Sequence, residues 1–308
     1  MEWLQNPVLL RAWCGVGALL AGATVIAWWF HRARPSPETQ RTKVRIRTWW
    51  FIAGSLFVAM AGGEPGMAVI FLAVSLLALR EFVFLDARAR RRGPVFLVLA
   101  TGAVFYYSGL VLNSGRLPFW IPDVAALLAM GLCLIVVMGA GKAAALALAA
   151  FLFGSMGIGF VVRLAQVPGE GGARTEMGLR LCFFLLLLTS LNDVAQYLWG
   201  KGMGRRKIVP RISPNKTWAG LIGGVMTTAL LAGIMAPWFT PFGWERGVIV
   251  GLLLGIGGFL GDIMVSAYKR SVGVGDSGAI LPGHGGILDR IDSLCVTAPL
   301  LYGLVFLN

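Results

Sequence analysis

Long runs of apolar residues alternate with short polar connections along almost the whole chain. A helix crosses the hydrocarbon core of a bilayer in about 20 apolar residues, with a usual range of roughly 17 to 25. By this rule we expect about ten membrane-spanning helices, a count good to one or two, at residues 7–31, 48–63, 66–85, 94–113, 119–138, 143–167, 179–200, 218–238, 247–267 and 294–307. The second and third runs are short and nearly adjacent, which predicts either a tight hairpin or a partly re-entrant pair. The pattern therefore predicts an all-α, polytopic integral membrane protein.

Composition excludes a soluble domain of this length. Of the 308 residues, 57% are hydrophobic and only 13% are charged, and the mean hydropathy is +0.77. A soluble domain needs a far larger charged surface. The first apolar run, from Pro7 to Phe30, is longer than the core of a signal peptide and is interrupted only by Arg11, so we expect a retained span. The four cysteines are scattered singly, which is typical of small buried hydrophobes rather than of a structural zinc site.

The net charge of +13 does not indicate binding to nucleic acid, because the basic residues follow a membrane topology. Alternate connections hold 20 of the 27 Lys and Arg residues, at 32–47, 86–93, 139–142, 201–216 and 268–292. Cytoplasmic loops carry the excess of Lys and Arg, so these connections are predicted to face the cytoplasm and the amino terminus to lie outside. Their basic residues then anchor the topology and contact anionic headgroups. The chain is compact and shows no transit or retention signal, so we expect a multi-pass protein of a prokaryotic cell inner membrane.

Polar residues inside apolar runs concentrate in the last third of the chain. We therefore expect residues 1–178 to form a transmembrane scaffold and residues 179–308 to form a transmembrane catalytic region. The cytoplasmic loops of this second region are predicted at 201–217 and 268–292, and no internal repeat is evident.

Four aspartates of this region are candidates for chemistry. Asp193 and Asp262 lie inside apolar runs at similar depth. A lone carboxylate at the centre of a membrane helix costs roughly 2.5–3.5 kcal/mol or more unless it is paired or binds a metal; a hydrogen bond to an asparagine or serine of another helix is the plain alternative. Asp289 and Asp292 are spaced so that a helix would put both on one face. Neighbouring carboxylates repel unless a cation joins them, and such hard oxygen ligands suit Mg²⁺ together with substrate phosphates.

Two further stretches on the same predicted face favour an anion. In SPNKTWAG (residues 213–220), Lys216 and Thr217 fall at the start of the next predicted helix, where free backbone N–H groups and the helix dipole favour phosphate. A lysine snorkelling to the interface is the alternative. The glycines of PGHGGILDRID (residues 282–292) permit close approach of the backbone to a ligand. Carboxylates for a divalent cation, fixed positive charges and glycine-rich backbone are together what phosphoryl or nucleotidyl transfer requires.

The last third also carries a longer signature. It comprises Asp193 with Tyr197, the stretch from Gly200 to Lys207, SPNKTW at 213–218, Ser266, Lys269, Arg270, Asp276, PGHGG at 282–286 and DRID at 289–292. These stretches resemble, at specific spacing, the signature of the phosphatidate cytidylyltransferase (CDP-diacylglycerol synthase) family. The resemblance covers roughly residues 190–308, and the part before it is similar only in being polytopic.

The resemblance implies an enzyme of phospholipid biosynthesis that transfers CMP from CTP to phosphatidic acid, giving CDP-diacylglycerol and pyrophosphate. It implies Mg²⁺ as the cofactor, with a second, monovalent cation left open. The implied partners are CTP, phosphatidic acid or a related lipid phosphate, and membrane lipids; nucleic acid is not among them, and a homodimer is left open. The implied catalytic residues are Asp193, Lys216, Lys269, Asp289 and Arg290. The implied substrate-binding residues are Ser213, Asn215, Lys216, Thr217, Arg270, His284, Gly285 and Gly286. The implied metal-binding residues are Asp193, Asp262, Asp289 and Asp292.

Three positions depart from the family pattern. Gly275 stands where a lysine is usual, Ala219 where an acidic or amide residue is usual, and Gln196 where a small residue is usual. These departures motivate an alternative, a paralogue that activates another lipid phosphate, such as an isoprenoid-based one. A membrane transporter is a third hypothesis, because intramembrane aspartates often mark ion pathways. Against it, the sequence lacks paired broken helices in two halves, and its charges cluster on one face.

Overall fold

The structure of the chain is a computed structural model that describes residues 6–85, 92–113, 120–169, 174–275, 277–278 and 285–307. Its elements follow in the order α1 Pro7–Ala33, α2 Pro37–Ala61, α3 Gly63–Leu85, α4 Arg92–Asn113, α5 Trp120–Met138, α6 Lys142–Phe151, the π-helix η2 Leu152–Gly157, α7 Ile158–Ala165, α8 Arg174–Met203, α9 Trp218–Phe239, α10 Trp244–Ser271, α11 Leu288–Ile291 and α12 Leu294–Phe306. Within these residues no β-strand forms, and an isolated antiparallel bridge joins Lys207 and Thr217. The prediction of an all-α fold is confirmed.

Eight helices of the described segments are long and apolar enough to cross a membrane. They are Pro7–Ala33, Gly63–Leu85, Arg92–Leu112, Ile121–Met138, Lys142–Ala165, Glu176–Met203, Trp218–Phe239 and Trp244–Ser271. The two remaining predicted spans fall on α2, whose first turns carry charged residues of the 32–47 connection, and on α12, which has only 13 residues. The polytopic architecture is therefore confirmed, while ten spans to within one or two stays a prediction.

The predicted span 143–167 is a continuous path through α6, η2 and α7, but its middle is π-helical. A π-helical turn is rare and marks a local departure from the regular hydrogen-bond ladder. Here the hydroxyl of Tyr107 donates to the carbonyl oxygen of Ser155 over 3.3 Å. A Cβ on Gly157 would stand 2.7 Å from the carbonyl oxygen of Cys295, so the backbone of α12 lies directly against this turn. The interruption thus makes room for α12.

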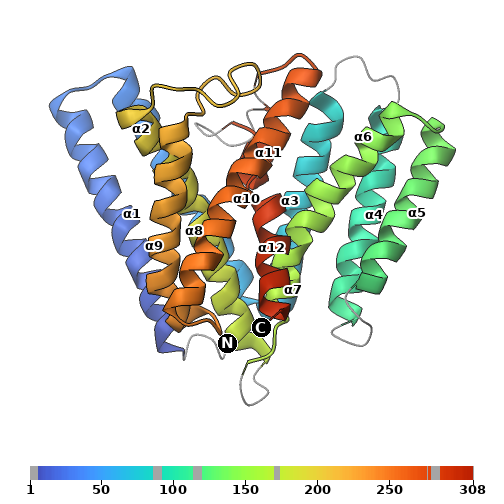
Figure 1. Cartoon of the computed structure of the whole chain (residues 1–308), viewed down its shortest axis with the longest axis horizontal. Coiled ribbons are helices and arrows are strands. Elements are labelled where there is room, and N and C mark those ends of the chain that lie inside the picture. The colour runs from blue at the N-terminus through green and yellow to red at the C-terminus, as the bar shows by residue number, and fades with distance from the viewer. Residues whose placement is uncertain are drawn as a thin grey trace.

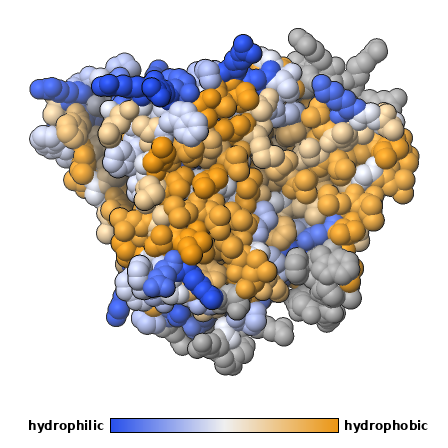
Figure 2. All heavy atoms as spheres, viewed as in Figure 1, coloured by the Kyte–Doolittle hydropathy of each residue, from blue (hydrophilic) through white to orange (hydrophobic). Residues whose placement is uncertain are grey.

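The helices run side by side, and their connections gather at two opposite ends of the bundle (Figure 1). The α1–α2, α5–α6 and α8–α9 connections lie at the upper end in this view, whereas α12 ends at the lower end. A broad hydrophobic belt separates the polar ends in the space-filling view (Figure 2). This arrangement agrees with the alternation read from the basic residues. Which end faces the cytoplasm stays a prediction.

Small residues bring α8, α9 and α10 into direct backbone contact. A Cβ on Gly220 of α9 would stand 2.7 Å from the carbonyl oxygen of Gln196 in α8, and one on Gly251 of α10 would stand 2.6 Å from the Cα of Ala229 in α9. Such close approach is typical of membrane helices. Thr217 caps α9, because its Oγ1 accepts a hydrogen bond from the backbone N–H of Gly220 over 3.1 Å. The start of α9 is therefore held firmly against α8.

The chain after Gly285 folds into the bundle, so that α12 begins near its mid-height (Figure 1). The buried carboxylate of Glu81, on α3, accepts hydrogen bonds from the backbone N–H groups of Ile287 and Leu288 over 2.9 and 2.8 Å. A carboxylate beside the free N–H groups of a helix start is stabilising. A helix of the predicted scaffold therefore holds a loop of the predicted catalytic region, and a division at residue 178 stays a prediction.

Candidate active site

Six charged side chains, which we call the polar centre, meet among the apolar helices. They are Asp193 on α8, Lys216 just before α9, Asp262 and Lys269 on α10, Asp289 on α11, and Asp292 directly after it. All six were singled out from the sequence. Ion pairs, hydrogen bonds and electrostatic interactions connect these six side chains.

Lys216 joins three segments of the bundle. Its Nζ lies 2.5 Å from Oδ2 of Asp262 and donates to Oε1 of Gln196 over 3.2 Å. The same Nζ stands 5.7 Å from the centre of the Phe259 ring. The side chains of Lys216 and Asp262 are only 19% and 24% exposed, so this ion pair is screened less than a surface pair would be. Lys216 therefore points inward to a carboxylate, not outward as a snorkelling lysine would.

Lys269 and Asp289 form the second ion pair of the polar centre. Lys269 Nζ lies 2.5 Å from Oδ1 of Asp289, while Oδ2 accepts from the hydroxyl of Ser277 over 2.7 Å and from its backbone N–H over 3.4 Å. Burial alone would raise the pKa of Asp289, but hydrogen bonds from Lys269 and Ser277 hold that pKa below its ordinary value. Gly285 has a φ of 82°, which favours glycine, and a Cβ there would stand 3.4 Å from Oδ2. The carboxylate of Asp289 is therefore ionised, and both of its oxygens have hydrogen-bond partners.

Asp193 and Asp292 meet at the junction of α11 and α12. The hydroxyl of Ser293 lies 3.1 Å from both Oδ1 of Asp193 and the carbonyl oxygen of Gly258. Asp292 is 8% exposed, and its Oδ1 accepts from the backbone N–H of Ser293 over 2.8 Å. Burial raises the pKa of Asp292 well above its ordinary value, and the carboxylates of Asp262 and Asp193 raise it further. Carboxylates from α8, α10 and the α11–α12 junction thus act on one another electrostatically.

The polar centre offers hard oxygen ligands to a cation. As the side chains stand, no three His, Cys, Asp or Glu residues of the described segments gather closely enough to hold a metal ion. Lys216 and Lys269 instead neutralise Asp262 and Asp289. A divalent cation would relieve the repulsion around Asp292, and carboxylate oxygens are the protein ligands that Mg²⁺ prefers. The chemistry of the donor set therefore fits Mg²⁺.

Other predicted substrate-binding residues frame the polar centre. The guanidinium of Arg270 donates to the carbonyl oxygens of Ile212 and Val274 over 3.0 and 3.1 Å, which ties the loop before α9 to the end of α10. Ser213 accepts from the backbone N–H of Lys216 at its carbonyl oxygen, over 3.3 Å. Thr217, buried as the cap of α9, is committed to its own helix. These contacts hold the loops and position Lys216.

The remaining predicted residues have free or undescribed side chains. Asn215 and Arg290 are exposed, and neither side chain makes a hydrogen bond or ion pair with another residue that the structure describes. A Cβ on Gly286 would overlap the side chains of Ser277 and Glu81, so only glycine fits there. His284 lies outside the described residues.

Three residues of the site were not predicted as parts of it. Glu81 orients α11, Ser293 contacts Asp193, and Gln196 accepts from Lys216. Glu81 interrupts an apolar run as Asp193 does, so the same criterion of a buried acid would have found it. Gln196 was noted from the sequence only as a departure from the family pattern, and no sequence feature pointed to Ser293.

Comparisons with known proteins agree with the resemblance. The family model described as "Cytidylyltransferase family" matches residues 43–308. An Escherichia coli K12 protein called "Uncharacterized protein YnbB" is 36% identical over 293 residues, which cover 92% of this chain and 94% of that protein. A phosphatidate cytidylyltransferase of Staphylococcus aureus COL is 45% identical over 126 residues, and one of Brucella suis is 43% identical over 129. These two matches cover 40% and 41% of this chain and 48% and 46% of the relatives, about half their length.

The family match extends far beyond the signature residues, from the first turns of α2 to the end of the chain. It argues against the transporter hypothesis and confirms the enzyme class that the resemblance implies. The chain belongs to the cytidylyltransferase family and is a CTP-dependent nucleotidyltransferase of the membrane.

Proposed function

We propose that the chain is a phosphatidate cytidylyltransferase. An oxygen of the lipid phosphate would attack the α-phosphorus of CTP, forming a P–O–P bond as the bond to the β-phosphate oxygen breaks and pyrophosphate leaves. The observation that carries the proposal is the convergence of carboxylates and lysines from α8, α9, α10 and α11 within an apolar bundle. Relatives named phosphatidate cytidylyltransferase support the choice of lipid.

Positioning and charge neutralisation would supply most of the catalysis. A lipid phosphate is already ionised, so the reaction needs no covalent intermediate and no strong base. Lys216 and Lys269 are desolvated cations and would contact the phosphates of CTP. We assign the binding of Mg²⁺ to Asp193, Asp262, Asp289 and Asp292, whose oxygens are hard ligands. When bound, this ion would offset negative charge on the phosphates; a second, monovalent cation is left open.

Arg290 is proposed to contact the lipid phosphate. It is exposed beside the polar centre and, within the described residues, its guanidinium is not committed to a carboxylate. A guanidinium matches phosphate geometry with paired donors. Ser213, Asn215, Arg270, His284 and Gly286 stay predicted contributors to substrate binding or to the loops that frame it.

We further propose that the polar end bearing the basic loops faces the cytoplasm of a bacterial cell, because CTP is cytosolic. Phosphatidic acid would then enter sideways from the inner leaflet, with its chains remaining in hydrocarbon. A homodimer stays a prediction.

The test is an assay with purified protein in detergent, radiolabelled CTP, Mg²⁺ and phosphatidic acid. We expect lipid-linked cytidine label that disappears on chelation of the divalent cation and returns on its addition. Asp289→Ala serves as the inactive control. Label no higher than this control would refute the proposal for phosphatidic acid.

A second candidate is a paralogue that activates a different lipid phosphate. Gln196 is one of the departures from the family pattern. Its side-chain oxygen accepts a hydrogen bond from Lys216, so this departure lies in direct contact with the polar centre. Screening lipid phosphates in the same assay distinguishes the two, because a clear preference for phosphatidic acid would remove the second candidate.

A further inference from the structure

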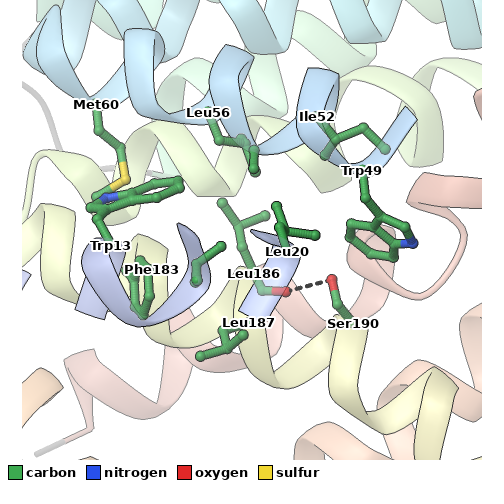
Figure 3. Close-up of a pocket in the computed structure, with 12 residues that line it drawn as sticks. Trp13, Leu20, Trp49, Ile52, Leu56, Met60, Phe183, Leu186, Leu187 and Ser190 are labelled. Atoms are coloured by element: carbon green, nitrogen blue, oxygen red, sulfur yellow. Dashed lines mark hydrogen bonds between the residues drawn. The ribbon is translucent and has the colours of Figure 1, made fainter. Parts of the chain in front are cut away.

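An apolar pocket lies between α1, α2 and α8, away from the polar centre (Figure 3). It comprises about 560 Å³ of empty space, a volume that includes space open to the outside. Its walls are aliphatic and aromatic except at Ser190, and the hydroxyl of Ser190 already donates to the carbonyl oxygen of Leu186 over 2.8 Å. Apart from the buried indole N–H of Trp13, which has no hydrogen-bond partner among the described residues, the lining is apolar, which suits a hydrocarbon.

The pocket is elongated along α8. Trp13, Met60 and Phe183 lie at one end, and Trp49 and Ser190 at the other (Figure 3). Phe183 and Ser190 are seven residues apart, which corresponds to about 10 Å along a helix axis. The Trp13 and Phe183 rings pack edge to face with centres 5.5 Å apart, so aromatic rings form the wall at the first end. A slot of this shape suits an extended chain better than a compact ligand.

The other end leads toward the polar centre. Asp193 follows Ser190 by three residues on α8, and residues three apart on a helix are neighbours on its surface. On α2, Trp49 lies two residues after the exposed Arg47, the last residue of a basic stretch. The end at Ser190 and Trp49 is thus followed on α8 by a carboxylate and preceded on α2 by a guanidinium, whereas the end at Trp13 and Phe183 is lined by aromatic rings. This polarity matches one chain of a lipid with its phosphate.

We infer that this pocket holds one acyl chain of the lipid phosphate whose phosphate reacts at the polar centre, an inference that rests on the proposed function. The aromatic wall at Trp13 and Phe183 limits the length of chain that fits. The pocket therefore contributes to selection of the lipid, and the proposed source of the chain is the substrate rather than a lipid of the surrounding bilayer.

The first test fills the slot between its ends. Ala53→Phe on α2 places a ring in the pocket, whereas Val58→Phe, on an exposed position of the same helix, is the matched control. With dioleoyl phosphatidic acid we expect kcat/KM to fall about tenfold in A53F, which corresponds to about 1.4 kcal/mol. With dihexanoyl phosphatidic acid it should change less than about twofold, and V58F should match the wild type with both lipids. An equal fall for both lipids, or none for either, would overturn the inference.

The second test needs no turnover. Phosphatidic acid with a photoreactive group at the end of one chain is compared with phosphatidylcholine that carries the same chain, and crosslinked peptides are mapped. We expect crosslinks on α1, α2 and α8 from phosphatidic acid, suppressed by excess unlabelled phosphatidic acid. Equal labelling by both lipids would identify a bilayer lipid and overturn the inference, as would absence of labelling in the pocket. Specific labelling without cytidylyl transfer would instead refute the proposed function and leave the pocket as a lipid phosphate site.

Discussion

Two groups of charged side chains lie between the helices of this bundle, and they differ in their balance of charge. Asp123 on α5 and Arg163 on α7 form a one-to-one ion pair of 2.5 Å, and the residues are 8% and 5% exposed. The polar centre instead combines four carboxylates with two lysines. A neutralised pair connects two helices and has no charge to spare. An excess of carboxylates is costly among apolar helices, and it agrees with the proposed binding of a divalent cation.

The position of each group in the chain sharpens the contrast. Asp123 and Arg163 lie on regular helices that both begin or end toward the lower end of the bundle (Figure 1). In the polar centre, Asp193, Asp262 and Lys269 also lie on long helices, whereas Lys216, Asp289 and Asp292 lie just before α9 and on the short segment around α11. The balanced pair therefore joins helices alone, whereas the unbalanced group also includes side chains of loops, which can approach a ligand.

The largest expected effect is on stability, at the balanced pair. Asp123→Ala leaves the Arg163 guanidinium buried without its carboxylate, so we expect the free energy of unfolding in detergent to fall by about 3–5 kcal/mol. The rate per folded molecule should stay within about twofold. Combining Asp123→Leu with Arg163→Met should recover most of the stability. If Asp123→Ala lowered the transfer rate but not the stability, the assignment of a structural role to the Asp123–Arg163 pair would be wrong.

The next largest effect is expected on the transfer rate, when an aspartate of the polar centre is replaced by alanine. Asp262→Ala removes a proposed Mg²⁺ ligand and the partner of Lys216, so we expect the rate of cytidylyl transfer to fall by about 10²–10³-fold. Stability should fall less than in D123A, because Lys216 keeps Gln196 as an acceptor and is partly exposed. The measurements are the transfer rate and the denaturation midpoint. A variant that unfolds as readily as D123A would place Asp262 among structural residues.

A smaller effect is expected from the amide that supports Lys216. Gln196→Ala removes a hydrogen bond to a charged group, which contributes about 1.5–3 kcal/mol, so kcat/KM for CTP should fall roughly ten- to a hundredfold. The matched control is Gln166→Ala, which removes a hydrogen bond of 2.9 Å to the carbonyl oxygen of Leu110, outside the polar centre. An equal loss of rate in both variants would show that neither effect is specific.

The smallest effect concerns pH. The pKa of Asp289 lies below its ordinary value of 3.8 in the folded chain, so its contribution to stability is present above that value and is lost as the pH falls through the lowered pKa. Ser277→Ala removes the hydroxyl that donates to this carboxylate, which moves the pKa back toward its ordinary value. The total loss of stability on acidification should then be smaller, and it should be complete at higher pH. Unfolding measured between about pH 2 and pH 6 tests this, and superimposable curves for variant and wild type would rule it out.

Local pattern was enough to predict most of the fold. Apolar runs long enough to cross a bilayer predicted the helices, because hydrocarbon requires every backbone group to be paired within its own segment. The π-helical turn Leu152–Gly157 and the deep start of α12 were not predicted. Both depend on contacts between distant segments, such as Gly157 against Cys295 and Glu81 with Leu288.

The candidate site was predicted as a set of residues but not as an arrangement. Asp193 and Asp262 stood out because charge inside an apolar run is costly. The pairing of Lys216 with Asp262, and of Lys269 with Asp289, could not be read from spacing along the chain. Thr217 and Arg270 make contacts that cap a helix and join two loops, and their binding of substrate stays a prediction.

The sequence by itself determined that this chain crosses a membrane as helices and that its acidic and basic residues suit transfer chemistry, because hydropathy and charge are properties of short segments. Only the tertiary structure decided which lysine neutralises which carboxylate and that Glu81 orients α11. It also decided that α1, α2 and α8 line a pocket whose one end lies near Asp193 along α8. Those features arise where helices remote in sequence pack together, and the energy of a buried charge depends on the partners that packing places beside it.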